Sequence, residues 1–242
     1  MRMTGGTTNY GEDVGILMLD TRFPRPPGDI GNAWSFDFPV RYKTVKGAFQ
    51  EMIMKHEPVP ELLDPFIEAA QELEREGVRA ITTSCGFLAP FQKELAAAIG
   101  IPVLASALLQ APLIHAMLPP SKKIGVFTER AVYMNERHFN GVGWSTDDIP
   151  VYVKGMKDDA VFPAVYIGDG NELDTDVLIA EMVEMTEEFM DECPDAGAIL
   201  FECTNMCPFS AHVAEASDLP VFDVNTLINL FHNAANPTPF LE

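Results

Sequence analysis

Two segments of the chain repeat the same order of residues 118 positions apart, and this repeat constrains the fold more than any other feature. AITTSCGFLAPF begins at Ala80 and AILFECTNMCPF begins at Ala198, and each reads as an apolar strand, a cysteine, a short polar stretch and Pro-Phe. The identical pairs at this spacing are Ala80/Ala198, Ile81/Ile199, Cys85/Cys203, Pro90/Pro208, Phe91/Phe209, Ala96/Ala214, Pro102/Pro220 and Val103/Val221. Any two strand-helix-strand units share apolar strands and prolines, but they have no reason to share a cysteine. The repeat therefore predicts two similar lobes related by a pseudo-two-fold axis.

Strands alternate with helices around both blocks. The apolar runs Val14–Leu19 and Ile124–Thr128 are typical of strands buried on both faces of a parallel sheet. Apolar residues recur at helical spacing after Asp64, which we expect to cap that helix, and in the acidic run from Leu178 to Phe189. This order predicts an α/β fold with two mainly parallel sheets.

The repeat also suggests where the chain divides. We place residues 1–118 and 221–242 in the first lobe and residues 119–220 in the second, with the last strand and helix packing back on the first lobe. Ligands of parallel sheets bind beyond the carboxyl ends of the strands. Because both cysteines follow such strand ends, we expect the active site in the cleft between the lobes.

Charge and hydropathy exclude several classes of partner. The chain has 36 acidic and 16 basic residues and a formal charge of −20, which repels nucleic-acid phosphates. No segment approaches the run of about 20 apolar residues that crosses a bilayer, so we expect a cytoplasmic protein with a small-molecule partner.

The four cysteines are expected to be reduced thiols. Cys203 and Cys207 lack the further ligands that would complete a metal site, and we expect none.

The two repeated cysteines are the main candidates for chemistry. Each is expected between a strand and a helix N-terminus, where backbone N–H groups and the helix dipole would lower the thiol pKa towards neutrality. Two such thiols facing one cleft can act as base and acid on opposite sides of a substrate carbon, which inverts a stereocentre. No cofactor is needed, and the chain lacks a Walker loop, a dinucleotide-binding glycine motif and an obvious lysine for pyridoxal phosphate.

Residues around the cysteines are candidates for binding a substrate carboxylate. The predicted donors are the N–H groups of Gly86, Phe87, Thr204 and Asn205 and the hydroxyls of Ser84 and Thr204.

Further candidates come from the ends of the first strand of each half. Asp20 could orient a thiol or form a turn with Thr21, and Arg22 could clamp a carboxylate or remain a solvated loop residue. Thr128 ends the matching strand and is a candidate substrate contact. Glu202 would raise the pKa of the neighbouring thiol if it faced the cleft, but strand alternation points it away from Cys203.

These motifs resemble those of the aspartate/glutamate racemase superfamily, from Gly15 to about Ala234, with Cys203-Thr204 matching the second cysteine motif. The resemblance implies that Cys85 and Cys203 are the acid and base, that pyridoxal phosphate is absent and that a homodimer is possible. The block TTSCGF is also similar to the algal dimethylsulfoniopropionate lyases of this superfamily, in which proton abstraction leads to β-elimination.

The match departs from the amino-acid racemases at Cys85-Gly86-Phe87, where they commonly have Cys-Asn-Thr. Three functions therefore stay open. The first is a racemase or epimerase acting alpha to the carboxylate of a small amino acid or related acid. The second is a lyase that forms acrylate and dimethyl sulfide, and the third is a binding protein that has lost its chemistry.

Overall fold

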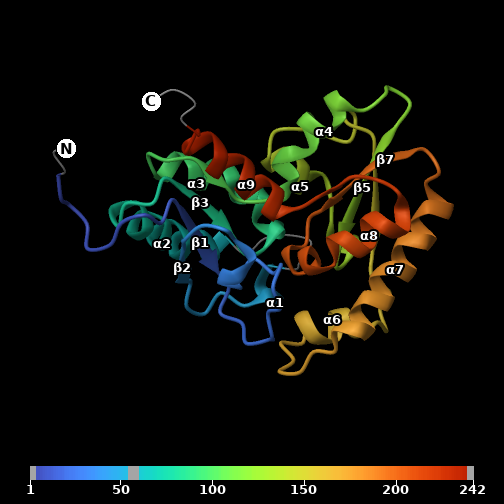
Figure 1. The fold of residues 1–242 in the computed structure, drawn as a ribbon, viewed down its shortest axis with the longest axis horizontal. Helices are drawn as coiled ribbons and strands as arrows, with labels where there is room; N and C mark the ends of the chain where they lie inside the picture. The colour runs from blue at the N-terminus through green and yellow to red at the C-terminus, as the bar shows by residue number, and fades with distance from the viewer. Residues whose placement is uncertain (1–3, 54–59, 239–242) are drawn as a thin grey trace.

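The computed structural model describes residues 4–53 and 60–238, and these form two four-stranded parallel sheets (Figure 1). The first sheet has the order β2-β1-β3-β4 and the second has the order β6-β5-β7-β8. The strands are β1 Val14–Met18, β2 Val40–Thr44, β3 Ala80–Thr83, β4 Val103–Leu104, β5 Lys123–Thr128, β6 Val151–Gly155, β7 Ala196–Phe201 and β8 Val221–Phe222. The identical order in the two halves confirms the predicted α/β fold with two similar lobes.

Helices cover the sheets of both lobes. They are α1 Gln50–Ile53, α2 Leu63–Arg75, α3 Gln92–Ala98, α4 Ala111–Met117, α5 Glu136–Gly141, α6 Val161–Tyr166, α7 Thr175–Glu192, α8 Ser210–Ser217 and α9 Val224–Ala235. Helix α2 buries Phe66 and Leu73 on its apolar face, but Asp64 does not cap it, because the helix begins one residue earlier, at Leu63. In the part of the chain that the structure describes, no helix is long and apolar enough to span a membrane.

Equivalent backbone bonds fix the residue before each cysteine. Ser84 N donates to Leu17 O at 2.9 Å, and Glu202 N donates to Phe127 O at 2.8 Å. These bonds continue the pairing of β3 with β1 and of β7 with β5 by one step. A short 3₁₀ helix follows each cysteine, at Gly86–Phe91 and at Thr204–Phe209. Both cysteines therefore lie at the carboxyl end of the third strand of their sheet.

Each lobe also sends a glycine against the other lobe's cysteine block. A Cβ at Gly28, where φ is +101°, would lie 2.7 Å from Pro208 Cα, and a Cβ at Gly141 would lie 2.6 Å from Pro90 Cα. Pro90 and Pro208 are a matched pair of the repeat. Only glycine allows this close approach on both sides, which brings the two blocks face to face.

The C-terminal segment divides between the lobes. Strand β8 pairs with β7 through Ile199↔Val221 and Leu200↔Phe222, so the expectation that this strand returns to the first lobe is wrong. Helix α9 does return, with the His232 ring stacked on Phe38 at 3.6 Å between ring centres (Figure 1). The strand completes the second sheet because β7 would otherwise be an uncovered edge. The remaining division at residues 118 and 119 stays a prediction, and residues 1–3 and 239–242 lie outside the described residues.

Candidate active site

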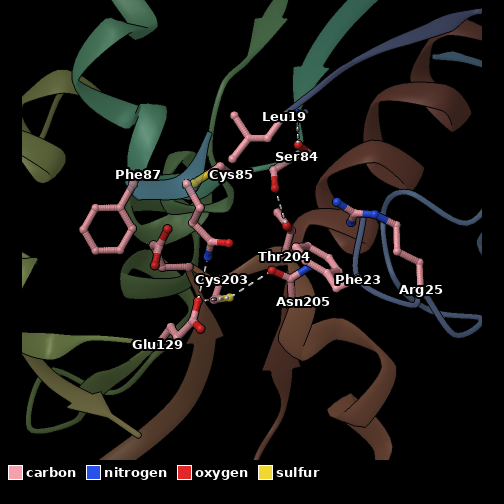
Figure 2. Close-up of a pocket in the computed structure, with 13 residues that line it drawn as sticks. Leu19, Phe23, Arg25, Ser84, Cys85, Phe87, Glu129, Cys203, Thr204 and Asn205 are labelled. Atoms are coloured by element: carbon pink, nitrogen blue, oxygen red, sulfur yellow. Dashed lines mark hydrogen bonds between the residues drawn. The ribbon is translucent and has the colours of Figure 1, made fainter. Parts of the chain in front are cut away.

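The thiols of both repeats line one pocket between the lobes (Figure 2). Cys85 is 9% exposed and Cys203 is 7% exposed. The complete lining is Leu19, Phe23, Arg25, Gln50, Ser84, Cys85, Gly86, Phe87, Glu129, Glu202, Cys203, Thr204 and Asn205. The free space that can hold the centre of a water molecule is about 10 Å³, which is room for about one water. The side chains of the lining therefore almost fill the pocket in this structure.

Matched backbone bonds orient the two cysteines. Leu88 N donates to Cys85 O at 3.1 Å, and Met206 N donates to Cys203 O at 3.2 Å. Each cysteine has extended backbone and precedes the first turn of its 3₁₀ helix. The structure thus brings the two sulfurs to one pocket, while their catalytic roles remain a prediction.

The pKa of each thiol is raised, which corrects the expectation of a low value. Burial is the largest cause for both thiols; Glu202 adds to the shift at Cys85, and Glu129 and Glu202 add to it at Cys203. Bonds from nearby backbone N–H groups lower both values but have the smaller effect. One short helical turn does not offset the loss of water and two nearby carboxylates. Burial therefore favours the neutral thiol over the thiolate at both cysteines.

Glu202 faces the pocket, contrary to the expectation from strand alternation. Strand β7 ends at Phe201, so the alternation does not extend to the next residue. Thr128 Oγ1 donates to Glu202 Oε2 at 2.6 Å, and Thr128 itself does not line the pocket. Gly86 leaves the space for it, because a Cβ there would lie 2.4 Å from Glu202 Oε1. Burial raises the pKa of Glu202 to about 8.

Glu129 is a site residue that the sequence analysis missed. It follows β5, is 1% exposed and accepts a hydrogen bond from Gln50 Nε2 at 3.0 Å. Cys203 Sγ lies 4.0 Å from Glu129 Oε2. Burial and then the neighbouring Glu202 raise the pKa of Glu129 well above its ordinary value. Aligning the first strands of the two halves, with Gly15 against Gly125, matches it to Leu19, which also lines the pocket in the structure.

The loop after β1 supplies an arginine to the pocket, but it is Arg25 and not Arg22. Arg25 Nη1 lies 2.6 Å from Asp29 Oδ1, and Arg25 Nη2 donates to Thr21 Oγ1 at 2.9 Å. The guanidinium carbon also lies 4.3 Å from the centre of the Phe23 ring. Arg22 is exposed and does not line the pocket.

The remaining predicted residues divide between the pocket and its surroundings. Ser84, Gly86, Phe87, Thr204 and Asn205 line the pocket, whereas Asp20 and Thr21 line a neighbouring depression.

Several of the predicted polar groups already join the two lobes. Thr204 Oγ1 donates to Ser84 O at 2.7 Å, and Asn205 Nδ2 donates to Asp29 Oδ2 at 2.9 Å. Within the first lobe, Ser84 Oγ accepts a bond from Leu19 N at 2.9 Å. Cys207 is buried but does not line the pocket. Across residues 4–53 and 60–238, no three His, Cys, Asp or Glu side chains gather as metal ligands.

Solved structures with the same fold include two enzymes. Unliganded arylmalonate decarboxylase superposes with a TM-score of 0.60 at 13% identity, over 94% of each chain. Glutamate racemase from Francisella tularensis subsp. tularensis SCHU S4 superposes with a TM-score of 0.53 at 16% identity, over 96% of this chain and 86% of the racemase. The predicted likeness to the racemase superfamily is confirmed at the level of the fold.

Curated relatives give a narrower assignment, although no protein-family model matches the chain. The chain is 34% identical over 224 residues to dimethylsulfoniopropionate lyase from Durusdinium sp. clade D, covering 90% of this chain and 73% of that protein. It is 32% identical over 233 residues to dimethylsulfoniopropionate lyase 7 from Emiliania huxleyi (strain CCMP1516), covering 93% of this chain and 68% of that one. With the shared fold, this similarity over most of both chains means that the protein belongs to the dimethylsulfoniopropionate lyase family.

Proposed function

We propose that the protein is a lyase that cleaves dimethylsulfoniopropionate into dimethyl sulfide and acrylate. The observation that carries this proposal is a closed pocket with one buried thiol from each lobe, in a chain one-third identical to a dimethylsulfoniopropionate lyase. The pocket contains groups that can remove a proton and groups that can hold a carboxylate, which are the two requirements of this elimination.

The reaction is a β-elimination that needs one base. The abstracting cysteine first releases its own proton to solvent. The resulting thiolate takes a proton from the carbon next to the carboxylate, and the C–H electron pair forms the C=C bond of acrylate. The C–S bond breaks with its electron pair on sulfur, so the sulfonium leaves as neutral dimethyl sulfide. The proton stays on the cysteine and then passes to solvent. Cys85 and Cys203 are the two candidate bases, and a desolvated thiolate is a strong one.

Arg25 is our candidate for binding the substrate carboxylate. Its guanidinium is held from one side by Asp29 and Thr21, and it lines the pocket with the N–H groups that follow each cysteine. Negative charge moves onto the carboxylate as the proton leaves, and donors fixed in advance stabilise that charge. Arg25 thereby takes the role that the sequence analysis gave to Arg22.

The proposal is tested by product formation. The purified protein is incubated with dimethylsulfoniopropionate, dimethyl sulfide is measured by gas chromatography of the headspace, and acrylate is measured by proton NMR. We expect equal amounts of both products from the wild type, and neither product from the Cys85→Ala, Cys203→Ala double variant. Absence of both products from a folded wild-type protein would overturn the proposal.

Racemisation is a second candidate, favoured by the presence of two thiols at one pocket where elimination needs only one. An acid and a base on opposite sides of a carbon are the requirement for inversion. The test uses a panel of α-amino acids and hydroxy acids in D₂O. Deuterium at the α-carbon with loss of optical activity supports an isomerase, and acrylate from the sulfonium acid supports the lyase.

A further inference from the structure

Two buried carboxylate oxygens at the pocket have no partner. Across the described residues, neither Glu129 Oε1 nor Glu202 Oε1 has a hydrogen-bond partner, and each residue is 1% exposed. A buried polar atom without a partner costs free energy, and such atoms in native proteins call for an explanation. Both side chains line the pocket that contains the thiols. Their missing partner is therefore expected to be a ligand that brings positive charge.

The rest of the wall suits a cation that has no N–H groups. Phe23 and Phe87 line the same pocket with Leu19, and aromatic rings beside carboxylates are the surroundings in which quaternary onium groups bind. Arg25 and Glu129 lie on either side of the two cysteines (Figure 2). A zwitterion with its carboxylate at Arg25 would thus have its cationic end directed towards the acidic wall.

We propose that Glu129 and Glu202 form a subsite for the sulfonium group, which makes the active site selective for onium acids over uncharged acids of the same shape. This inference rests on the proposed lyase function and adds the group that distinguishes the substrate. The sulfonium carries its charge next to the bond that breaks, so the same contact aligns that bond with the thiols.

The space outside the pocket indicates how a cation reaches these carboxylates. A neighbouring depression of about 210 Å³ carries Asp20, Glu51 and Asp169 on its wall. Gln50 lines both the depression and the thiol pocket, and its Nε2 donates to Glu129 Oε2. Lys46 Nζ lies 3.7 Å from Asp20 Oδ1 on this rim. A cation attracted by the rim can replace the Gln50 amide as the partner of Glu129.

Proton release is the expected signature of this subsite. Burial raises the pKa of Glu202 to about 8 and also raises the pKa of Glu129. A bound cation favours the ionised carboxylate, so binding expels a proton below that pH. Affinity for the cation should therefore rise about tenfold per pH unit towards pH 8 and then level off. The other ionisable groups that interact with these carboxylates are Cys85, Cys203, Arg130 and Tyr166.

The experiment compares two acids of the same shape by calorimetry. 3-(Trimethylammonio)propionate carries the positive charge, and 4,4-dimethylpentanoate has carbon in place of the nitrogen. At pH 8, where the affinity levels off, we expect the cation to bind wild-type protein about tenfold more tightly, as one charge-assisted contact in a buried site predicts. Glu129→Gln and Glu202→Gln should each remove most of this preference and leave binding of the neutral acid unchanged. The control is Glu187→Gln, on the exposed face of α7, which should keep the preference.

The outcomes separate this inference from the lyase proposal because binding is measured without turnover. If the wild type forms acrylate but binds both acids equally, the subsite is wrong and the lyase stands. If it forms no acrylate but prefers the cation, and both glutamine variants lose that preference, the subsite stands and the lyase falls. The variants are first shown to be folded by their melting temperatures. If they then bind both acids more weakly by the same factor, the carboxylates have only a structural role and the inference is overturned.

Discussion

The two lobes share a backbone but differ in charge at matched positions beside the thiols. In the first lobe the residue after β1 is Leu19 and the residue before the cysteine is Ser84; in the second lobe the corresponding residues are Glu129 and Glu202. The bonds that position Ser84 and Glu202 are the same in both halves. The repeat therefore sets where groups lie, and substitutions at matched positions set what they do.

This difference gives the pocket two unlike sides. The first lobe contributes Arg25 and the apolar Leu19, and the second contributes two carboxylates within reach of Cys203. A racemase that treats both faces of a carbon alike needs two similar thiols, whereas an elimination needs one base and a site for the leaving group. The asymmetry is the structural feature that favours the lyase over the isomerase.

The largest expected effect comes from removing one thiol at a time. General-base catalysis contributes about 10² to 10⁴ in rate, so loss of the abstracting thiol should lower kcat about 10³-fold. Because elimination needs one base, we expect Cys85→Ala and Cys203→Ala to differ by at least about tenfold. The measurement is acrylate formation at saturating substrate. Equal losses of kcat in both variants would contradict the proposed difference between the lobes and favour a symmetric two-thiol mechanism.

Replacing Arg25 has the next largest expected effect. Arg25→Met removes charge-assisted hydrogen bonds worth about 1.5–3 kcal/mol, so kcat/KM should fall about 10- to 100-fold, with a rise in KM. Arg25→Lys keeps the charge, so its kcat/KM should fall less than that of Arg25→Met. Initial rates over a range of substrate concentrations measure both constants. The matched control is Arg22→Met, because Arg22 is exposed and off the pocket. If kcat/KM falls as much in Arg22→Met as in Arg25→Met, the assignment of the carboxylate to Arg25 is contradicted.

The choice between these two arginines shows how far the sequence could predict the site. The repeat predicted the α/β lobes and the meeting of Cys85 with Cys203, because strand ends of parallel sheets gather at one edge. It identified the loop after β1 as a source of an arginine, but the loop's course depends on contacts such as that of Arg25 with Asp29. Such contacts are tertiary, and residue spacing does not encode them.

Burial explains the other differences between expectation and structure. The thiol pKa values depend on how completely the closed pocket excludes water, which the order of residues around Cys85 does not reveal. Glu202 was assigned to the wrong side because the last residue of β7 cannot be placed from periodicity to within one position. Strand β8 has only two residues, too few for an alternating pattern to indicate which sheet it joins.

The smallest expected effect concerns the matched pair Ser84 and Glu202, of which only the second can ionise near neutral pH. The folded protein raises the pKa of Glu202 from 4.5 to about 8 through burial. The folded state therefore binds an extra proton between these values, and the stability that this proton provides is present below pH 4.5 and lost as pH rises through 8. Relative to Glu202→Gln, the wild type should lose up to about 1.4 kcal/mol of unfolding free energy per pH unit.

Urea unfolding of both proteins at pH 5, 6, 7 and 8 measures this difference, and Glu187→Gln should follow the wild type throughout. A difference between wild type and Glu202→Gln that stays constant with pH would mean that Glu202 is ionised in the folded protein. The two lobes would then differ in permanent charge and not in a proton that a cationic ligand can displace.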